Sequence, residues 1–229
     1  MKRVLLSWSS GKDSAWTLHV LRQQTDVELV GLLTTFNEVA GRVAMHAVRR
    51  ELVEAQAATV RLPLWSVALP WPCSNTDYEA KMHEVVERAR QTSVTHIAFG
   101  DLFLEDIRTY RERQLAGTGI KPLFPIWGTA ADTPALAREM LAAELRAVLT
   151  CVDPKQLDGH FVGRWFDANL LTDLPVSVDP CGERGEFHTF CCAGPMFAAP
   201  IAVQIGDAAL RDGFWFVDLL PAGIENRRA

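Results

Sequence analysis

Residues 3–24 read RVLLSWSSGKDSAWTLHVLRQQ, and this stretch predicts the fold class. Its apolar residues 3–8 are typical of a short buried strand, which ends at the small polar residues 9–14. Asp13 or Ser14 can then cap a helix, because apolar residues recur at helical spacing over the rest of the stretch. A strand, a glycine-containing loop and a helix are therefore expected in immediate succession.

The same alternation continues along the chain. We expect strands at 27–35, 59–69 and 96–99 and helices at 46–57, 77–92 and 104–115. Strands that alternate with helices in this way predict an α/β protein with a parallel sheet.

The pattern becomes less regular in the second half of the chain. We expect an extended segment at 122–127, a helix at 133–145 and a strand at 147–152. From 153 to 189 Pro, Gly, Asp and Arg are frequent and apolar periodicity is poor, which predicts long functional loops or a small appended lobe. The sequence thus favours a domain at 1–130 and a smaller C-terminal lobe at 131–229.

Composition excludes several classes of protein. The chain has 229 residues and a net charge of -5, from 23 Lys and Arg against 28 Asp and Glu, so a dedicated nucleic-acid binder is disfavoured. Its 5 cysteines are odd in number and form no CxxC pair, which favours a reduced, cytoplasmic location. No segment has the run of about 18 apolar residues that a membrane-spanning helix needs.

The loop SSGKDS at residues 9–14 is the first candidate site. A glycine-containing turn between a strand and a helix directs backbone N–H groups and the positive end of the helix at one point, which suits a phosphate. The Walker pattern fails because Asp13 follows Gly11-Lys12 and Leu6 occupies the position of its first glycine, and GxGxxG is absent. The alternative is a plain strand-to-helix turn, since Ser, Gly and Asp are common in turns.

The loop resembles the pyrophosphate loop, S-G-G-x-D-S, of the ATP pyrophosphatase superfamily, in which ATP is cleaved between its α- and β-phosphates. Ser10 stands where the first glycine is usual, and serine suits that position less well if the backbone φ there is positive. The resemblance implies that ATP is bound by Ser9, Ser10, Gly11, Lys12, Asp13 and Ser14.

A second block, FGDLFLEDIRTYRER at 99–113, places Gly100-Asp101 at the carboxyl end of an expected strand, where ligands bind in open α/β sheets. Carboxylates there can hold magnesium, and we expect Asp13 and Asp101 to be the Mg²⁺ ligands. Helix-surface ion pairs are the alternative for Glu105 and Arg108, and a solvent-exposed face is favoured for Glu112 and Arg113.

A third block, DPCGERGEFHT at 179–189, resembles the P-C-G-E-x-G-E-[FY]-x-T signature of the diphthine–ammonia ligase (diphthamide synthase) family. The glycines on either side of Glu183 allow a tight turn, so that Glu183 and Glu186 are expected to face one pocket. Cys181 is either a nucleophile or, as its surroundings favour, a packed unreactive thiol. A zinc site from Cys181, His188, Cys191 and Cys192 is conceivable but lacks a CxxC pair.

Together, the three blocks imply a Rossmann-like, HUP-type parallel sheet sandwiched by helices, with a smaller C-terminal substrate lobe. They also imply an ATP-dependent amide ligase that adenylates a carboxylate, transfers ammonia or an amine to it, and releases AMP and pyrophosphate. Ser10 and Phe187-His188-Thr189 resemble the bacterial branch of the family. Because bacteria lack diphthamide, the reaction class transfers to this chain better than the substrate does.

The resemblance also distributes roles among residues and partners. The substrate is expected to be a small-molecule or protein carboxylate, and the chain is a candidate homodimer. A pyrophosphate-loop enzyme that modifies tRNA and a regulatory module that binds ATP without turnover remain as alternatives. The expected catalytic residues are Lys12, Asp13, Asp101, Glu183 and Glu186; further ATP contacts are Thr35, His46 and Gly100; and substrate contacts are Glu105, Arg108, Tyr110, Arg164, Cys181, Gly182, His188 and Thr189.

Overall fold

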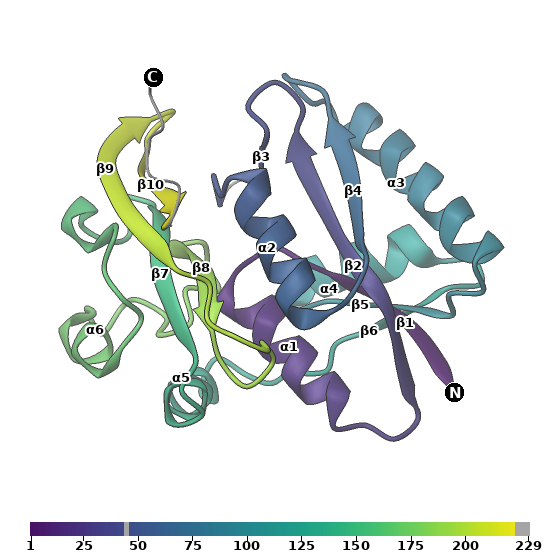
Figure 1. Ribbon diagram of the computed structural model, residues 1–229, viewed down its shortest axis with the longest axis horizontal. Coiled ribbons are helices and arrows are strands. Elements are labelled where there is room, and N and C mark those ends of the chain that lie inside the picture. The colour runs from purple at the N-terminus through teal and green to yellow at the C-terminus, as the bar shows by residue number, and fades with distance from the viewer. Residues whose placement is uncertain (44–45, 223–229) are drawn as a thin grey trace.

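The computed structural model describes residues 1–43 and 46–222, and these form two β-sheets with helices between and around them (Figure 1). The expected C-terminal lobe at 131–229 therefore includes residues 223–229, which lie outside the described part of the chain. Within residues 1–43 and 46–222, no helix is both long enough and apolar enough to cross a membrane.

The first sheet is built from five parallel strands in the order β4-β2-β1-β5-β6, which confirms the predicted α/β, Rossmann-like class. The chain moves outward from β1 to β4 and then returns to place β5 on the other side of β1. A crevice forms at such a reversal, outside the carboxyl ends of the strands. The strands are β1 (Lys2–Ser7), β2 (Val27–Asn37), β4 (Leu64–Leu69), β5 (His96–Ala98) and β6 (Lys121–Leu123), and the short β3 (Arg42–Val43) pairs antiparallel with β2.

Four helices cover this sheet, two on each face. The buried residues of α1 (Lys12–Arg22) and α2 (Arg50–Val60) belong to one apolar cluster, whereas those of α3 (Asn75–Gln91) and the end of α4 (Glu105–Leu115) belong to another. The expected strand at 59–69 was wrong at its start, because α2 continues to Val60 and the left-handed Arg61 ends it.

The second sheet is antiparallel, with the order β8-β7-β10-β9. The expected strand at 147–152 is confirmed within β7, and the expected helix at 133–145 is confirmed but ends earlier, at Ala142. The sequence did not predict the other three strands. The elements are α5 (Thr133–Ala142), β7 (Arg146–Val152), the 3₁₀ turn η1 (Gly159–Phe161), α6 (Ala168–Asp173), β8 (Phe187–Ala193), β9 (Val203–Arg211) and β10 (Phe214–Pro221).

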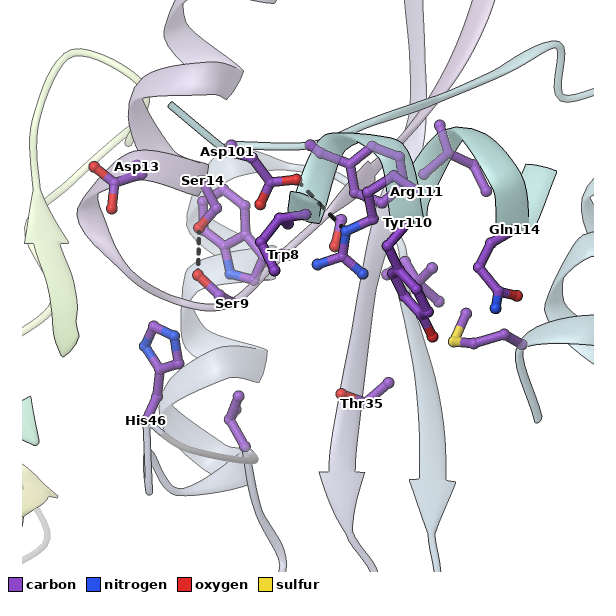
Figure 2. A pocket seen from close by; sticks show the side chains of 18 of the residues that line it. Trp8, Ser9, Asp13, Ser14, Thr35, His46, Asp101, Tyr110, Arg111 and Gln114 are labelled. Carbon is purple, nitrogen blue, oxygen red and sulfur yellow. Dashed lines mark hydrogen bonds and ion pairs between the residues drawn. The ribbon is translucent and has the colours of Figure 1, made fainter. Parts of the chain in front are cut away.

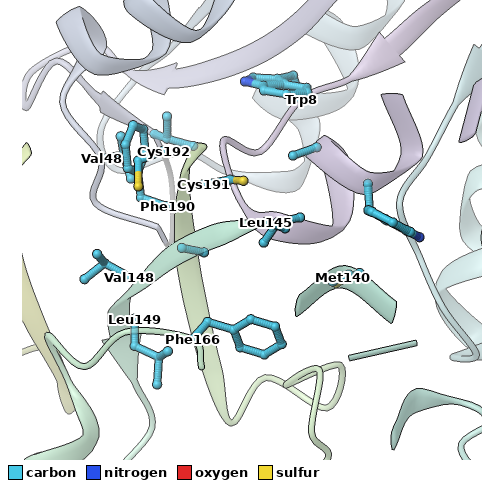
Figure 3. Packing of buried hydrophobic residues seen from close by; sticks show 14 of the residues in the cluster. Trp8, Val48, Met140, Leu145, Val148, Leu149, Phe166, Phe190, Cys191 and Cys192 are labelled. Atoms are coloured by element: carbon cyan, nitrogen blue, oxygen red, sulfur yellow. The ribbon is translucent and has the colours of Figure 1, made fainter. Parts of the chain in front are cut away.

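The larger apolar cluster joins the two sheets, because α1 and α2 lie between them (Figure 1). Its buried side chains come from both sheets, as Figure 3 shows for Trp8, which follows β1, for Cys191 and Cys192 on β8, and for Val148 and Leu149 on β7. A backbone hydrogen bond also connects the two sheets: the N–H of Cys191 on β8 donates to the carbonyl of Ser10 over 2.9 Å. The loop between β1 and α1 is thus attached to the second sheet.

Candidate active site

A cavity of about 680 Å³ lies over the carboxyl ends of β1 and β5, where the strand order reverses (Figure 2). Its lining comes from the loop before α1, from β2, from α3 and α4, and from the turn before β8. The three sequence blocks that were singled out therefore meet at one cavity. The sequence-predicted residues that line it are Ser9, Lys12, Asp13, Ser14, Thr35, His46, Gly100, Asp101, Tyr110, Gly182, Glu183, His188 and Thr189.

The loop at 9–14 has a backbone that suits glycine at Ser10. The φ of Ser10 is 72°, in the left-handed region where a Cβ is unfavourable. Its side chain is fully buried, and its Oγ has no hydrogen-bond partner within residues 1–43 and 46–222. At Gly11 a Cβ would lie 3.1 Å from the His46 ring and 3.2 Å from the Thr189 carbonyl, so this position has little room for a side chain.

Lys12, which is buried, and Asp13, which is half-buried, form an ion pair beside the loop. The Lys12 Nζ lies 2.9 Å and 3.0 Å from the two Asp13 oxygens and also donates to the carbonyl of Cys181. It lies 5.5 Å and 5.4 Å from the ring centroids of Phe166 and Phe187. Burial, the largest single cause, lowers the pKa of Lys12, but Asp13 together with the nearby acidic groups of Cys181 and Glu183 outweighs it, so the pKa lies above its usual value. Lys12 is therefore a permanent cation at the base of the cavity.

Gly100 and Asp101 follow β5, as the sequence predicted. A Cβ at Gly100 would lie 3.1 Å from the backbone of Asp13 and Ser14, so glycine allows the start of α1 to approach β5 closely. The Asp101 carboxylate lines the cavity, and burial raises its pKa despite Arg111, whose Nε lies 3.5 Å away. This arrangement places a second carboxylate in the cavity that Ser9, Lys12, Asp13 and Ser14 of the loop also line.

Glu183 enters the cavity from the turn before β8. Its Oε1 accepts a hydrogen bond of 2.7 Å from the backbone N–H of Leu102. Burial raises the pKa of Glu183 to about 7, with smaller contributions from the carboxylates of Asp13 and Asp101. A carboxyl group with such a pKa can both accept and release a proton near neutral pH.

Glu186, which was expected to share the pocket with Glu183, does not line the cavity. It is almost fully buried, and its oxygens accept hydrogen bonds of 2.9 Å from the backbone N–H groups of Asp179 and Arg184. Gly182 and Gly185 both have positive φ, of 70° and 84°, within this turn. In this structure the Glu186 carboxylate holds the turn that presents Glu183.

Several other predicted residues lie away from the cavity lining. The Cys181 thiol is buried, which raises its pKa, and it lies 3.6 Å from the Thr133 carbonyl. Arg164 pairs with Asp173 over 2.7 Å, and Arg108 pairs with Glu112 over 2.9 Å. Glu105 is exposed at the start of α4. Ser10 and Gly11 belong to the loop at 9–14, but they are buried and do not line the cavity.

Two imidazoles form one side of the cavity. The rings of His46 and His188 lie 4.7 Å apart, and the Nδ1 of His46 is 3.1 Å from the Thr189 carbonyl. Burial lowers the pKa of His46 to about 4 and that of His188 to about 3. Both rings are therefore neutral at neutral pH. Within residues 1–43 and 46–222, no three His, Cys, Asp or Glu side chains are grouped so that they could hold a metal ion.

Apart from Tyr110, the sequence did not predict the residues that α3 and α4 supply to the wall of the cavity. The lining residues on α4 recur at the three- and four-residue spacing of one helix face. This spacing could have identified them once a helix was expected there. The lining residues that were missed on the two helices are Tyr78, Glu79, Met82, His83, Val86, Ile107, Arg111, Gln114 and Leu115.

Comparison with known proteins identifies the same family that the three sequence blocks resemble. A family model described as the diphthamide synthase N-terminal domain matches residues 1–122, and one described as the diphthamide synthase C-terminal domain matches residues 132–222. Similar curated proteins include the diphthine–ammonia ligases of Rattus norvegicus and Mus musculus. Each is 22% identical to this chain, over 91% of this chain and 85% of the relative.

Proposed function

The chain belongs to the diphthamide synthase family, and we propose that it is an ATP-dependent amide ligase that releases AMP and pyrophosphate. One observation carries the proposal. The loop at 9–14, which resembles the pyrophosphate loop, and the titratable Glu183 line one cavity at the reversal of strand order.

ATP binding is assigned to the loop and the start of α1. Backbone N–H groups at the N-terminus of a helix bind phosphate well, and α1 begins at Lys12. The buried Lys12 ammonium neutralises the leaving pyrophosphate. Thr35 and the neutral His46, which line the same cavity, contact the adenosine.

Magnesium is compatible with these side chains. Mg²⁺ is commonly held by one or two carboxylates together with the phosphates of the substrate. Asp13 and Asp101 both line the cavity and are the carboxylates that would hold it. Bound there, the ion would neutralise phosphate charge.

The reaction follows in two steps. An oxygen of the substrate carboxylate attacks the α-phosphorus, the bond from that phosphorus to the bridging oxygen of the β-phosphate breaks, and pyrophosphate leaves. The nitrogen of ammonia then attacks the acyl carbon, and AMP leaves with the oxygen that made the attack. Glu183 accepts the proton that the nitrogen loses, because its pKa of about 7 lets the carboxylate form take up a proton near neutral pH.

We propose the same division of the chain as the sequence favoured. Residues 1–130 bind the nucleotide, and residues 131–229 form the lobe that supplies Glu183 and the substrate contacts Gly182, His188 and Thr189. The names of the relatives support ammonia as the nitrogen donor. The carboxylate belongs to a small molecule or to a protein.

The test is to incubate the full chain with ATP, Mg²⁺, ammonium and a panel of carboxylic acids labelled with ¹⁸O. The expected products are the amide, pyrophosphate and AMP that carries one ¹⁸O atom from the acid. Formation of ADP, or AMP without the label, would show that the acid is not adenylated. ATP binding with no pyrophosphate from any acid would favour the regulatory module.

Glu183→Gln tests the proposed base. Loss of a general base typically lowers a rate by about 10²–10⁴-fold, and we expect amide formation to fall within that range. With the concentration of unprotonated ammonia held constant, the rate in the parent chain should rise as pH rises through about 7, because the Glu183 carboxylate must be unprotonated to accept a proton. Glu183→Gln should lose this rise, whereas Glu112→Gln, at an exposed residue of α4, should keep it. An unchanged pH profile in Glu183→Gln would contradict the assignment.

A further inference from the structure

We infer that the wall of the cavity formed by α3 and α4 binds the substrate acid, with Arg111 holding the carboxylate and apolar side chains holding the rest of the molecule. The substrate class is then a small monocarboxylic acid with an apolar or aromatic body. This inference rests on the proposed ligase function and gives that reaction its substrate class.

The guanidinium group of Arg111 lines the cavity and has N–H donors that can bind a ligand. Its guanidinium carbon lies 4.9 Å from the ring centroid of Phe99 and 6.0 Å from that of Tyr110, and these rings limit its movement. Its one hydrogen bond within residues 1–43 and 46–222 is the long contact of Nε with Asp101, at 3.5 Å. The two terminal nitrogens therefore remain available to a ligand.

The guanidinium of Arg111 points in a direction that suits the carboxylate of a reacting substrate. Figure 2 shows the guanidinium pointing into the space between the loop at Ser9 and the ring of Tyr110. Two parallel N–H groups of an arginine match the two oxygens of a carboxylate. The loop and Lys12 already supply a phosphate site, so Arg111 supplies a second, separate anion site in the same cavity.

The surface beyond Arg111 carries several apolar side chains beside the rings of Tyr78 and His83. Met82 and Val86 on α3 face the cavity, as do Ile107 and Leu115 on α4. The nearby polar groups Glu79 and Gln114 contact each other, with Gln114 Nε2 and Glu79 Oε1 3.4 Å apart. Burial of an apolar body against this wall is favourable, whereas a second carboxylate on the substrate would meet Glu79 without a partner.

Binding measured without turnover tests this inference. Titration calorimetry on the full chain, without ATP, compares 3-phenylpropionate with acetate, which lacks the apolar body, and with 3-phenylpropionamide, which lacks the charge. We expect 3-phenylpropionate to bind at least about tenfold more tightly than either, because each lacks one of the two recognised features.

Variants separate the two parts of the site. Arg111→Gln should weaken 3-phenylpropionate binding by about tenfold or more, and Arg111→Lys should fall between this variant and the parent chain. Met82→Ser, which adds no charge, should weaken 3-phenylpropionate but not acetate. Arg113→Gln, at an exposed residue of the same helix, is the matched control and should bind as the parent does. Circular dichroism confirms that each variant is folded.

Three results would overturn the inference: no binding of the aromatic acid, equal binding of acid and amide, or a loss of ATP affinity rather than acid affinity in Arg111→Gln. The last result would assign Arg111 to the nucleotide. Failure of the ligase proposal can be distinguished from failure of this inference. In that case acid and ATP would both bind, but no AMP labelled with ¹⁸O would form.

Discussion

At the scale of single residues, Ser10 combines two unfavourable features in the loop that carries the proposed chemistry. Its φ of 72° lies in the left-handed region, which costs a residue with a Cβ about 1–2 kcal/mol. Its Oγ is buried without a partner among the described residues, and such a group costs roughly 1–3 kcal/mol. The sequence had identified Ser10 as the departure from the usual glycine, and the structure shows that the departure falls at a positive φ.

We expect Ser10→Gly to raise the free energy of unfolding by about 1–2 kcal/mol, because relief of both features exceeds the added entropy of glycine in the unfolded chain, roughly 0.5–1 kcal/mol. Ser10→Ala removes only the hydroxyl and should give a smaller gain. Urea unfolding measures each value. Ser93→Gly is the control for the positive φ alone, since Ser93 has a φ of 60° but its side chain is exposed rather than buried. A Ser10→Ala protein less stable than the parent would show that the hydroxyl has a partner.

At the scale of elements, α2 holds the loop through one buried side chain. Gln56 accepts a hydrogen bond of 2.8 Å from the Trp8 indole at the end of β1. Its amide nitrogen donates to the carbonyls of Ser10 and Cys191, over 3.0 Å and 2.6 Å. One carboxamide thus connects the end of β1, the loop and β8, so we propose Gln56 as a positioning residue.

Gln56→Leu should lower the free energy of unfolding by about 2–4 kcal/mol, because the Trp8 indole, the Ser10 carbonyl and the Cys191 carbonyl each lose one buried hydrogen bond. The loop loses a fixed contact, so the KM for ATP should rise several-fold while the pH profile of the reaction keeps its midpoint. Gln91→Leu, at an exposed position near the end of α3, should change neither value. Chemical unfolding and steady-state kinetics measure both effects, and an unchanged KM in a destabilised Gln56→Leu protein would limit Gln56 to a structural role.

Elements with a clear local period could be predicted, and those defined by distant contacts could not. β1 and α1 follow from the apolar spacing of residues 3–24. β8, in contrast, is buried on both faces and reads FHTFCCA, without the alternation of a half-buried strand. The site shows the same limit, because the sequence identified Glu183 and Glu186 together. Only the folded turn decides that Glu183 faces the cavity and Glu186 the backbone.

At the scale of the whole molecule, the candidate site depends on how the two sheets are joined. Asp218 on β10 accepts hydrogen bonds from Arg42 on β3, at 2.8 Å, and from Arg49, at 2.6 Å, just before α2. Arg42 also donates to the Ala47 carbonyl over 2.7 Å, next to His46 in the cavity wall. This cluster therefore connects the second sheet to the segment that carries His46.

The pH dependence of stability tests that connection. Burial acts to raise the pKa of Asp218, but hydrogen bonds from Arg49 and Arg42 outweigh it and lower the pKa to about 2. A carboxylate with a lowered pKa in the folded state stabilises the fold above its ordinary pKa of 3.8, and this contribution is lost as pH falls through about 2. Because the group is partly open to solvent, we expect it to contribute only about 1 kcal/mol at neutral pH.

Asp218→Asn should therefore lower the free energy of unfolding at neutral pH by about 1 kcal/mol. The difference from the parent should shrink as pH falls from about 4 towards 2, because the parent then loses the same charge. Asp207→Asn, at an exposed position of β9, should show no such difference. If Asp218→Asn destabilised the chain equally at both ends of this range, the loss would come from packing, and the ion cluster would not be what joins the two sheets.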